Sequence, residues 1–196
     1  MNFFIGLAIF LVTSVVHAES DRRAYFETSY GDFVIDLHEE EAPKASRQVA
    51  NLVRMGFYTG AELSSTSKNY YVQIDDVRNR KDPLYEEQEA FIKPVPYEDS
   101  GYSHIKWAVA LTSTNDKGDG ETAISILTGN SPDLDGTQTI VGYVEKGFST
   151  LEKIEALRTN EKDYLETPVI LQKTWWLTKD KALAKFEENN SVKGNQ

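Results

Sequence analysis

Alternating apolar and polar side chains predict that this chain is mainly β. Residues 25–37 alternate around a turn at Tyr30-Gly31-Asp32, a pattern typical of a hairpin. Later runs rich in aromatic and β-branched residues predict further strands. These runs are residues 70–74, 107–111, 123–127, 139–144 and 168–177. Segments rich in Gly and Asp separate the runs, as expected for turns.

Two segments follow the helical period instead. The first lies between Pro43, which suits a first helical position, and Gly56, which suits a C-terminal cap. The second is expected to begin near Ser149, because Ser149 and Glu152 have the spacing of a capping box. The apolar faces consist of Ala45, Val49, Leu52 and Val53 in the first helix and Leu151, Ile154 and Leu157 in the second.

Two polar segments are expected to contain little regular structure. Residues 78–100 are charged and contain prolines, so they predict a loop. The C-terminal tail, residues 179–196, predicts two turns of helix around residues 182–186 and disorder beyond them.

Many short strands with two well-separated helices favour a β-barrel or a sandwich closed by helices. The strand at 168–177 follows the second helix and could close a barrel by pairing with an early strand. Closure would remove the exposed sheet edges. The chain has 196 residues, which suits one domain with its own core.

The N-terminus predicts a signal peptide over residues 1–18. Residues 3–16 form a nearly unbroken apolar run, and Val16-His17-Ala18 has the small residues that signal peptidase accepts. The run is short for a membrane span, although an uncleaved anchor is the alternative. We therefore expect a protein of the secretory pathway, the ER lumen or the periplasm, with no membrane association after cleavage.

Charge and cysteine content exclude several classes of function. The net charge of −10 argues against sequence-independent binding to nucleic acid or to anionic lipid. The absence of cysteine excludes disulfides, thiolate zinc sites and thiol catalysis. We expect a monomer without metal or cofactor.

Five segments, in order and at the right spacing, resemble the cyclophilin family. They are residues 26–37, 41–52, 56–60, 70–76 and 134–142, and the resemblance extends over residues 25–178. It implies a closed eight-stranded antiparallel β-barrel capped by two α-helices. It also implies a function, because members of this family isomerise X-Pro peptide bonds.

Rotation about an X-Pro bond is slow because the barrier of about 18–20 kcal/mol reflects the loss of amide resonance. An enzyme accelerates rotation by binding the twisted bond better than the planar one. In the family, an apolar pocket holds the proline ring and an arginine hydrogen-bonds the twisted imide. The resemblance places Ser65 at the position of this arginine, and Ser125 at the position of a phenylalanine that contacts the proline.

The remaining residues expected to line the peptide site show a similar loss. Only the glutamine and the leucine of the family pattern are unchanged, and Asp133 stands where Trp or His is usual. The expected lining residues are Tyr70, Tyr71, Gln73, Leu111, Ala123, Ser125, Leu134 and Gln138. These changes predict weak or absent isomerase activity and the loss of cyclosporin binding.

Two functions remain open at this point. One is a non-catalytic module that binds an extended or proline-containing peptide or protein. The other is a prolyl isomerase that still assists protein folding. No residue pattern supports a third, unrelated enzyme.

Three smaller features have less weight. His38 and His104 are expected in turns or at the surface, without a catalytic triad. Residues 116–121 lack the ligand spacing of a calcium loop. Asn189-Asn190-Ser191 is a glycosylation sequon, which matters only in a eukaryotic host.

Overall fold

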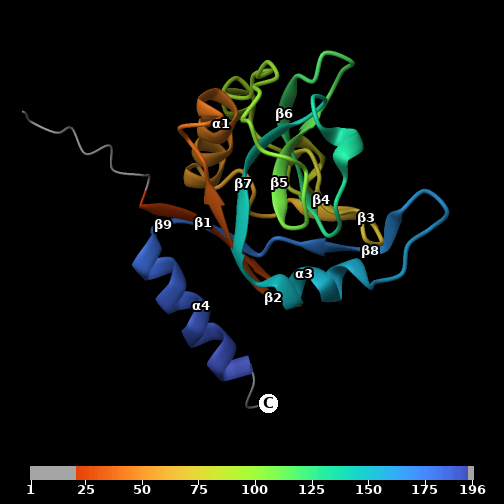
Figure 1. Cartoon of the computed structure of the whole chain (residues 1–196). Coiled ribbons are helices and arrows are strands. Elements are labelled where there is room, and N and C mark those ends of the chain that lie inside the picture. Colours follow the sequence, from red (N-terminus) through yellow and green to blue (C-terminus); the bar gives the residue numbers. More distant parts are fainter. Residues whose placement is uncertain (1–20, 194–196) are drawn as a thin grey trace, which may run out of the picture.

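The computed structural model describes residues 21–193, so the predicted signal peptide lies outside the described residues. Its nine strands form one antiparallel sheet that curls into a barrel, and the helices lie around this barrel (Figure 1). The strands are β1 Arg22–Thr28, β2 Gly31–Leu37, β3 Glu62–Ser67, β4 Tyr71–Ile74, β5 Ala108–Ser113, β6 Gly120–Leu127, β7 Thr139–Lys146, β8 Tyr164–Ile170 and β9 Lys173–Thr178. The α-helices are α1 Pro43–Arg54, α2 Glu86–Glu89, α3 Phe148–Glu155 and α4 Lys179–Lys193, and the 3-10 turns are η1 Val77–Asn79 and η2 Pro132–Leu134. No helix of the described part is long and apolar enough to cross a membrane.

The final stretch of the chain closes the sheet, as predicted. Strand β8 pairs with β3, and β9 pairs with β1, so the two ends of the strand order are joined through two consecutive residues. At this junction, Leu171 exchanges backbone hydrogen bonds with Gly60 and Ala61, and the Gln172 N–H donates to the Glu27 carbonyl. The expected count of eight strands was wrong, because this last strand is interrupted and counts as two.

Alternation along the strands separates a barrel core from an outer face. Phe26 and Phe33 stack in the core with ring centroids 4.8 Å apart. Tyr58 lies against Phe26, and its hydroxyl donates to the Thr122 carbonyl over 2.7 Å. Helices α1 and α3 lie at opposite ends of the barrel and bury their apolar faces against it (Figure 1). The two helices that the sequence predicts are therefore the two caps.

Local backbone geometry agrees with the predicted ends of α1 and with the predicted start of α3 near Ser149, but not with the predicted cap of α3. Helix α1 begins at Pro43, and Gly56 follows its end with φ of 73°, as a C-terminal glycine should. Helix α3 begins at Phe148, directly after Gly147, whose φ is 90°. A Cβ at Gly147 would lie 2.3 Å from the Asp32 carbonyl oxygen. The backbone at Gly147 thus sets the start of α3, and the Ser149 side chain makes no capping hydrogen bond.

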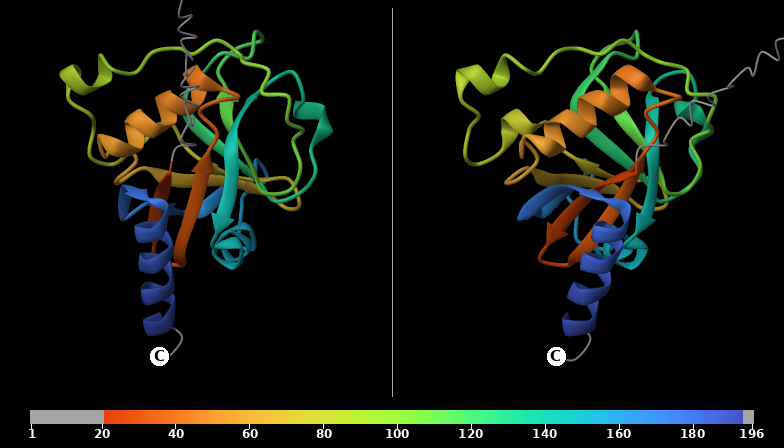
Figure 2. Two further views of the ribbon diagram at one scale, coloured as in Figure 1. Left: turned by 60° about the vertical axis from the view of Figure 1, so that its left-hand side comes forward. Right: turned by 90° about the vertical axis from the view of Figure 1, so that its left-hand side faces the viewer.

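The expectation of a mostly disordered C-terminal tail was wrong for residues 179–193. Helix α4 runs against β1 and β2 and projects beyond the barrel (Figure 2). Ala182 is fully buried with Tyr25 and Val34, and Phe186 packs on this cluster. The tail is polar in composition, but Ala182 and Phe186, four residues apart, give one side of the helix an apolar contact with the barrel.

A polar network also holds α4 to the barrel. The buried Tyr25 hydroxyl donates to Asp32 Oδ2 over 2.6 Å. Asn189 Nδ2 donates to the same Asp32 oxygen over 2.7 Å and to the Tyr25 hydroxyl oxygen over 3.3 Å. Lys185 Nζ lies 2.7 Å from Glu27 Oε1. The amide nitrogen that a glycan at the sequon would occupy is therefore engaged, so helix docking and glycosylation of Asn189 compete.

Replacing Asn189 by alanine should loosen α4. We expect Asn189→Ala to lower the free energy of unfolding by about 1–3 kcal/mol, since a hydrogen bond to a buried carboxylate is lost. Urea unfolding at neutral pH measures this change. Asn190→Ala is the matched control, because Asn190 Nδ2 donates only within the helix, to the Phe186 carbonyl. Equal effects of the two substitutions would contradict the docking role of Asn189.

Candidate functional site

Strand pairing brings four of the nine expected site residues, Ser65, Tyr71, Gln73 and Ser125, onto the outer face of the barrel in two neighbouring rows. The first, which we call the polar row, runs across four strands. In it, Ser65 on β3 is opposite Gln73 on β4, Gln73 is opposite Ser125 on β6, and Ser125 is opposite Ala110 on β5. The second, which we call the tyrosine row, contains Ser67, Tyr71, Leu127, Ala108 and Tyr143.

The polar row is lined by small hydroxyl groups and one amide. Ser65 and Ser125 are only 5% and 4% exposed, so neighbouring side chains on the outer face largely cover them. The Ser125 hydroxyl is 2.9 Å from the hydroxyl of Thr112, the next residue on this face of β5. Gln73 is half-buried, and its side chain makes no hydrogen bond within residues 21–193. This row offers donors and acceptors to a ligand but no fixed positive charge.

No arginine stands at the Ser65 position. Arg78, which follows β4, is held by the carboxylates of Asp76 and Glu121. Glu121 is four residues from Ser125 along β6, which corresponds to about 13 Å at the rise of a β-strand. Arg80 donates to the carbonyls of Phe57 and Asp82. Both arginines of the segment after β4 are therefore engaged away from Gln73.

Tyrosine side chains occupy the other row. Tyr71 packs with Leu134 and Tyr143 on a cluster of Ala108, Leu127 and Ile140. Leu134 comes from the η2 turn, which lies over this part of the face. Tyr71 is therefore packed against the barrel between β4 and the η2 turn.

The preceding residue, Tyr70, bridges to the η2 turn. Its hydroxyl donates to Asp133 Oδ2 over 2.9 Å, and its ring lies 5.3 Å from that of Tyr71 in an edge-to-face arrangement. Burial, followed by the hydrogen bond to Asp133, raises the pKa of Tyr70 above its ordinary value of 10.0. Tyr70 thus stays a neutral donor at physiological pH.

A buried histidine holds the η2 turn in place: His104 lies in the loop before β5, which agrees with an expected position in a turn, but it is not at the surface. His104 is 2% exposed, its ring Nδ1 lies 2.7 Å from Asp135 Oδ1, and its backbone N–H donates to the same oxygen over 2.9 Å. The His104 carbonyl accepts from the Ser131 N–H over 2.7 Å. These contacts fix both ends of the turn that carries Asp133 and Leu134. Sequence reasoning missed this role, because no motif links residues 104 and 135.

Three of the expected lining residues take other positions. The Leu111 side chain points into the barrel core and is 1% exposed, so it does not line the face. The large apolar residues of β5, Val109 and Leu111, alternate with the small Ala110 and Thr112, and this alternation was the available signal. Ala123 lies on the outer face of β6, two residues beyond Ser125. Gln138 lies where the η2 loop enters β7, and its Oε1 is buried without a hydrogen-bond partner in the described chain.

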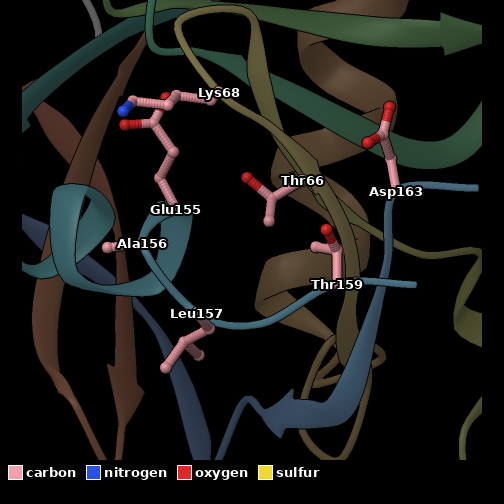
Figure 3. Close-up of a pocket in the computed structure, with 7 residues that line it drawn as sticks. All are labelled: Thr66, Lys68, Glu155, Ala156, Leu157, Thr159 and Asp163. Atoms are coloured by element: carbon pink, nitrogen blue, oxygen red, sulfur yellow. The ribbon is translucent and has the colours of Figure 1, made fainter. Parts of the chain in front are cut away.

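A separate hollow of about 360 Å³ lies beside the β3–β4 hairpin (Figure 3). Its polar walls come from β3, the end of α3 and the loop that leads to β8. Thr66 points into it, and the Thr66 hydroxyl donates to the Tyr71 carbonyl over 2.8 Å. The lining residues are Thr66, Lys68, Glu155, Ala156, Leu157, Thr159 and Asp163. In the described part of the chain, no group of three histidines or acids has a geometry that could hold a metal ion.

Comparisons with known proteins agree on one family. The family model described as "Cyclophilin type peptidyl-prolyl cis-trans isomerase/CLD" matches residues 23–175. The curated peptidyl-prolyl cis-trans isomerase CYP23 of Arabidopsis thaliana is 29% identical over 202 residues, covering 97% of this chain and 88% of the relative. The peptidyl-prolyl cis-trans isomerase-like 1 of Aspergillus fumigatus is 28% identical, covering 70% of this chain and 84% of the relative.

A solved structure shares the fold at low identity. It is a cyclophilin type peptidyl-prolyl cis-trans isomerase of Cryptosporidium parvum, crystallised in the presence of the dipeptide Ala-Pro. It superposes with a TM-score of 0.66 at 19% identity, covering 78% of this chain and 96% of that one. Barrel architecture is thus retained despite extensive sequence change.

The His104–Asp135 contact should be visible in a carboxyl titration. The hydrogen bonds from the His104 side chain and backbone lower the pKa of Asp135 below its ordinary 3.8. The ionised carboxylate therefore stabilises the folded state above pH 3.8, and this contribution is lost as the pH falls through the lowered value. We expect the NMR titration midpoint of Asp135 to move up toward 3.8 in His104→Ala. His38→Ala is the control, and an unchanged midpoint in His104→Ala would contradict the contact.

Proposed function

The chain belongs to the cyclophilin-type peptidyl-prolyl cis-trans isomerase family, and from this premise we propose that it is a peptide-binding module whose isomerase activity is weak or lost. The observation that carries the proposal is the polar row. A seryl hydroxyl stands at the family's arginine position, and a second seryl hydroxyl stands at its phenylalanine position.

Weak catalysis follows from the chemistry of that row. Rotation requires groups that bind the twisted imide better than the planar one. Loss of one preorganised donor to developing charge costs about 10²–10³ in rate. Ser65 is too short to replace a guanidinium, and Arg78 is held by two carboxylates elsewhere on the face.

Peptide binding is supported by what the row retains. The Gln73 amide and the hydroxyl of Ser125 offer hydrogen bonds of the kind that an extended backbone uses. Leu134 and Tyr71 supply an apolar border. The proposed ligand is an extended or proline-containing segment of a peptide or protein, bound by a monomer. Cyclosporin should not bind, because the proline pocket that receives it is partly filled by Tyr71 and open to polar groups at Ser125.

The second candidate is an active prolyl isomerase that assists protein folding. Family membership and the retained Gln73 and Leu134 favour it. Both candidates predict peptide binding, and turnover separates them.

Turnover of an Ala-Pro peptide, followed by NMR exchange, is the deciding measurement. We expect wild-type turnover to be about 10²–10³ below that of an ordinary cyclophilin. Ser65→Arg alone should recover little turnover, because the side chain at position 125 is still a polar serine and cannot provide an apolar wall. Ser65→Arg with Ser125→Phe restores donor and apolar wall together and should raise turnover by about tenfold or more.

Arg78→Ala provides the control for this measurement. It should leave turnover unchanged, since the Arg78 guanidinium is bound to Asp76 and Glu121. Wild-type turnover within about tenfold of an ordinary cyclophilin would overturn the proposal and favour the second candidate.

We also infer export of the protein into a secretory or periplasmic compartment. The apolar run at residues 3–16 and the small residues before position 19 support this inference. N-terminal sequencing of the protein purified from its host is expected to begin at Glu19. A sequence beginning at Met1 or Asn2 would contradict cleavage.

A further inference from the structure

The η2 turn, beside the tyrosine row on the outer face of the barrel, carries a carboxylate that forms no ion pair with another described residue. Asp133 is exposed at the start of η2, and it accepts one hydrogen bond, from the Tyr70 hydroxyl. Within residues 21–193, Asp133 takes part in no ion pair. Asp135, two residues away, is already engaged with His104. The charge of Asp133 is therefore available to a ligand.

A tyrosine pair begins at this carboxylate, since the Tyr70 hydroxyl contacts Asp133 and the Tyr70 ring packs on Tyr71. The Tyr70 ring is half-buried and edge-to-face with that of Tyr71, so its orientation is constrained from two directions. A carboxylate next to an aromatic side chain can bind an ammonium or guanidinium group by ion pairing, and a ring face adds cation–π attraction where the cation lies over it. A neutral or acidic side chain would gain neither interaction.

The lysines of this region do not fill the position. Lys106 is paired with Glu152 and lies over the Trp107 ring. Lys68 lines the hollow beside the β3–β4 hairpin instead. With a net charge of −10, the chain as a whole also favours a basic ligand.

We propose that Asp133, Tyr70 and Tyr71 form a subsite for a lysine or arginine side chain of the bound peptide. This inference rests on the proposed function, because it names the class of peptide that the same face selects. Tyr71 is two residues from Gln73 along β4, or about 7 Å. An extended peptide covers the same distance in two residues, so the basic residue lies about two positions from the residue bound over Gln73.

Six short peptides test the proposal by calorimetric titration of the whole exported chain. They are Ac-Ala-Xaa-Ala-Pro-Ala-NH2 and Ac-Ala-Pro-Ala-Xaa-Ala-NH2, with Lys, Gln or Glu as Xaa. In one of the two series, the Lys peptide should bind about three- to tenfold more tightly than the Gln peptide, and the Glu peptide more weakly. The preference should shrink at high ionic strength.

Variants locate the preference. Asp133→Asn should remove most of the preference for the Lys peptide over the Gln peptide, because the ion pair is lost and only the cation–π attraction remains. Asp116→Asn is the matched control, since it removes the same charge from an exposed turn on which the proposal places no role. Tyr70→Leu should reduce the preference, and Tyr70→Phe should keep most of it because the ring remains.

Each result has a distinct meaning. Equal binding of Lys, Gln and Glu peptides by the wild type would overturn the subsite and leave the proposed function intact. An equal loss of preference in Asp133→Asn and Asp116→Asn would also overturn it, because general charge attraction would then suffice. Failure of all six peptides to bind would overturn the proposed function, and the subsite with it.

Discussion

Closure of the barrel by the interrupted last strand is the constraint on which the other features depend. Because β8 pairs with β3 and β9 pairs with β1, no strand can shift register without opening the sheet. Side chains on a strand alternate between faces, so a shift of one residue would exchange core and surface. On β4, the registered pairing puts Val72 and Ile74 in the core and leaves Tyr71 and Gln73 outside. The site is a consequence of that pairing.

Much of this architecture can be predicted from local sequence patterns. The elements that could not be predicted depend on contacts between residues far apart in the chain. Pro43 and Gly56 mark helix α1 because their effects are local to the backbone. Helix α4 was not predictable in the same way. Its docking depends on Asn189 reaching Tyr25 and Asp32, more than one hundred and fifty residues earlier in the chain. Composition alone therefore made a docked helix look like a polar tail.

At the candidate site, the sequence predicted which residues lie near one another better than it predicted which way their side chains point. Alignment to the family pattern assigned residues such as Leu111 to the face, but strand alternation turns this side chain inward. It also left out Thr112, which reaches the face and contacts Ser125. The role of His104 arises from a pairing with Asp135 across two loops, which no spacing rule in the sequence contains. Residue identity could be carried over from the resemblance, whereas side-chain orientation required the closed barrel.

Under the proposed function, the chemistry of the two rows would let this face bind a peptide without accelerating its isomerisation. Groups that bind the planar and the twisted peptide equally well lower the energy of both states together and do not accelerate rotation. A cation or a tight apolar wall at the imide would distinguish the two states, and the polar row contains neither. Tyr70 directly precedes β4, three residues before Gln73, and hydrogen-bonds Asp133 on the η2 turn, so affinity gained at this pair would be independent of rotation about the bound bond. Under the two proposals together, binding at the polar row would be uniform and selectivity would come from Asp133 and Tyr70, as expected of a recognition surface.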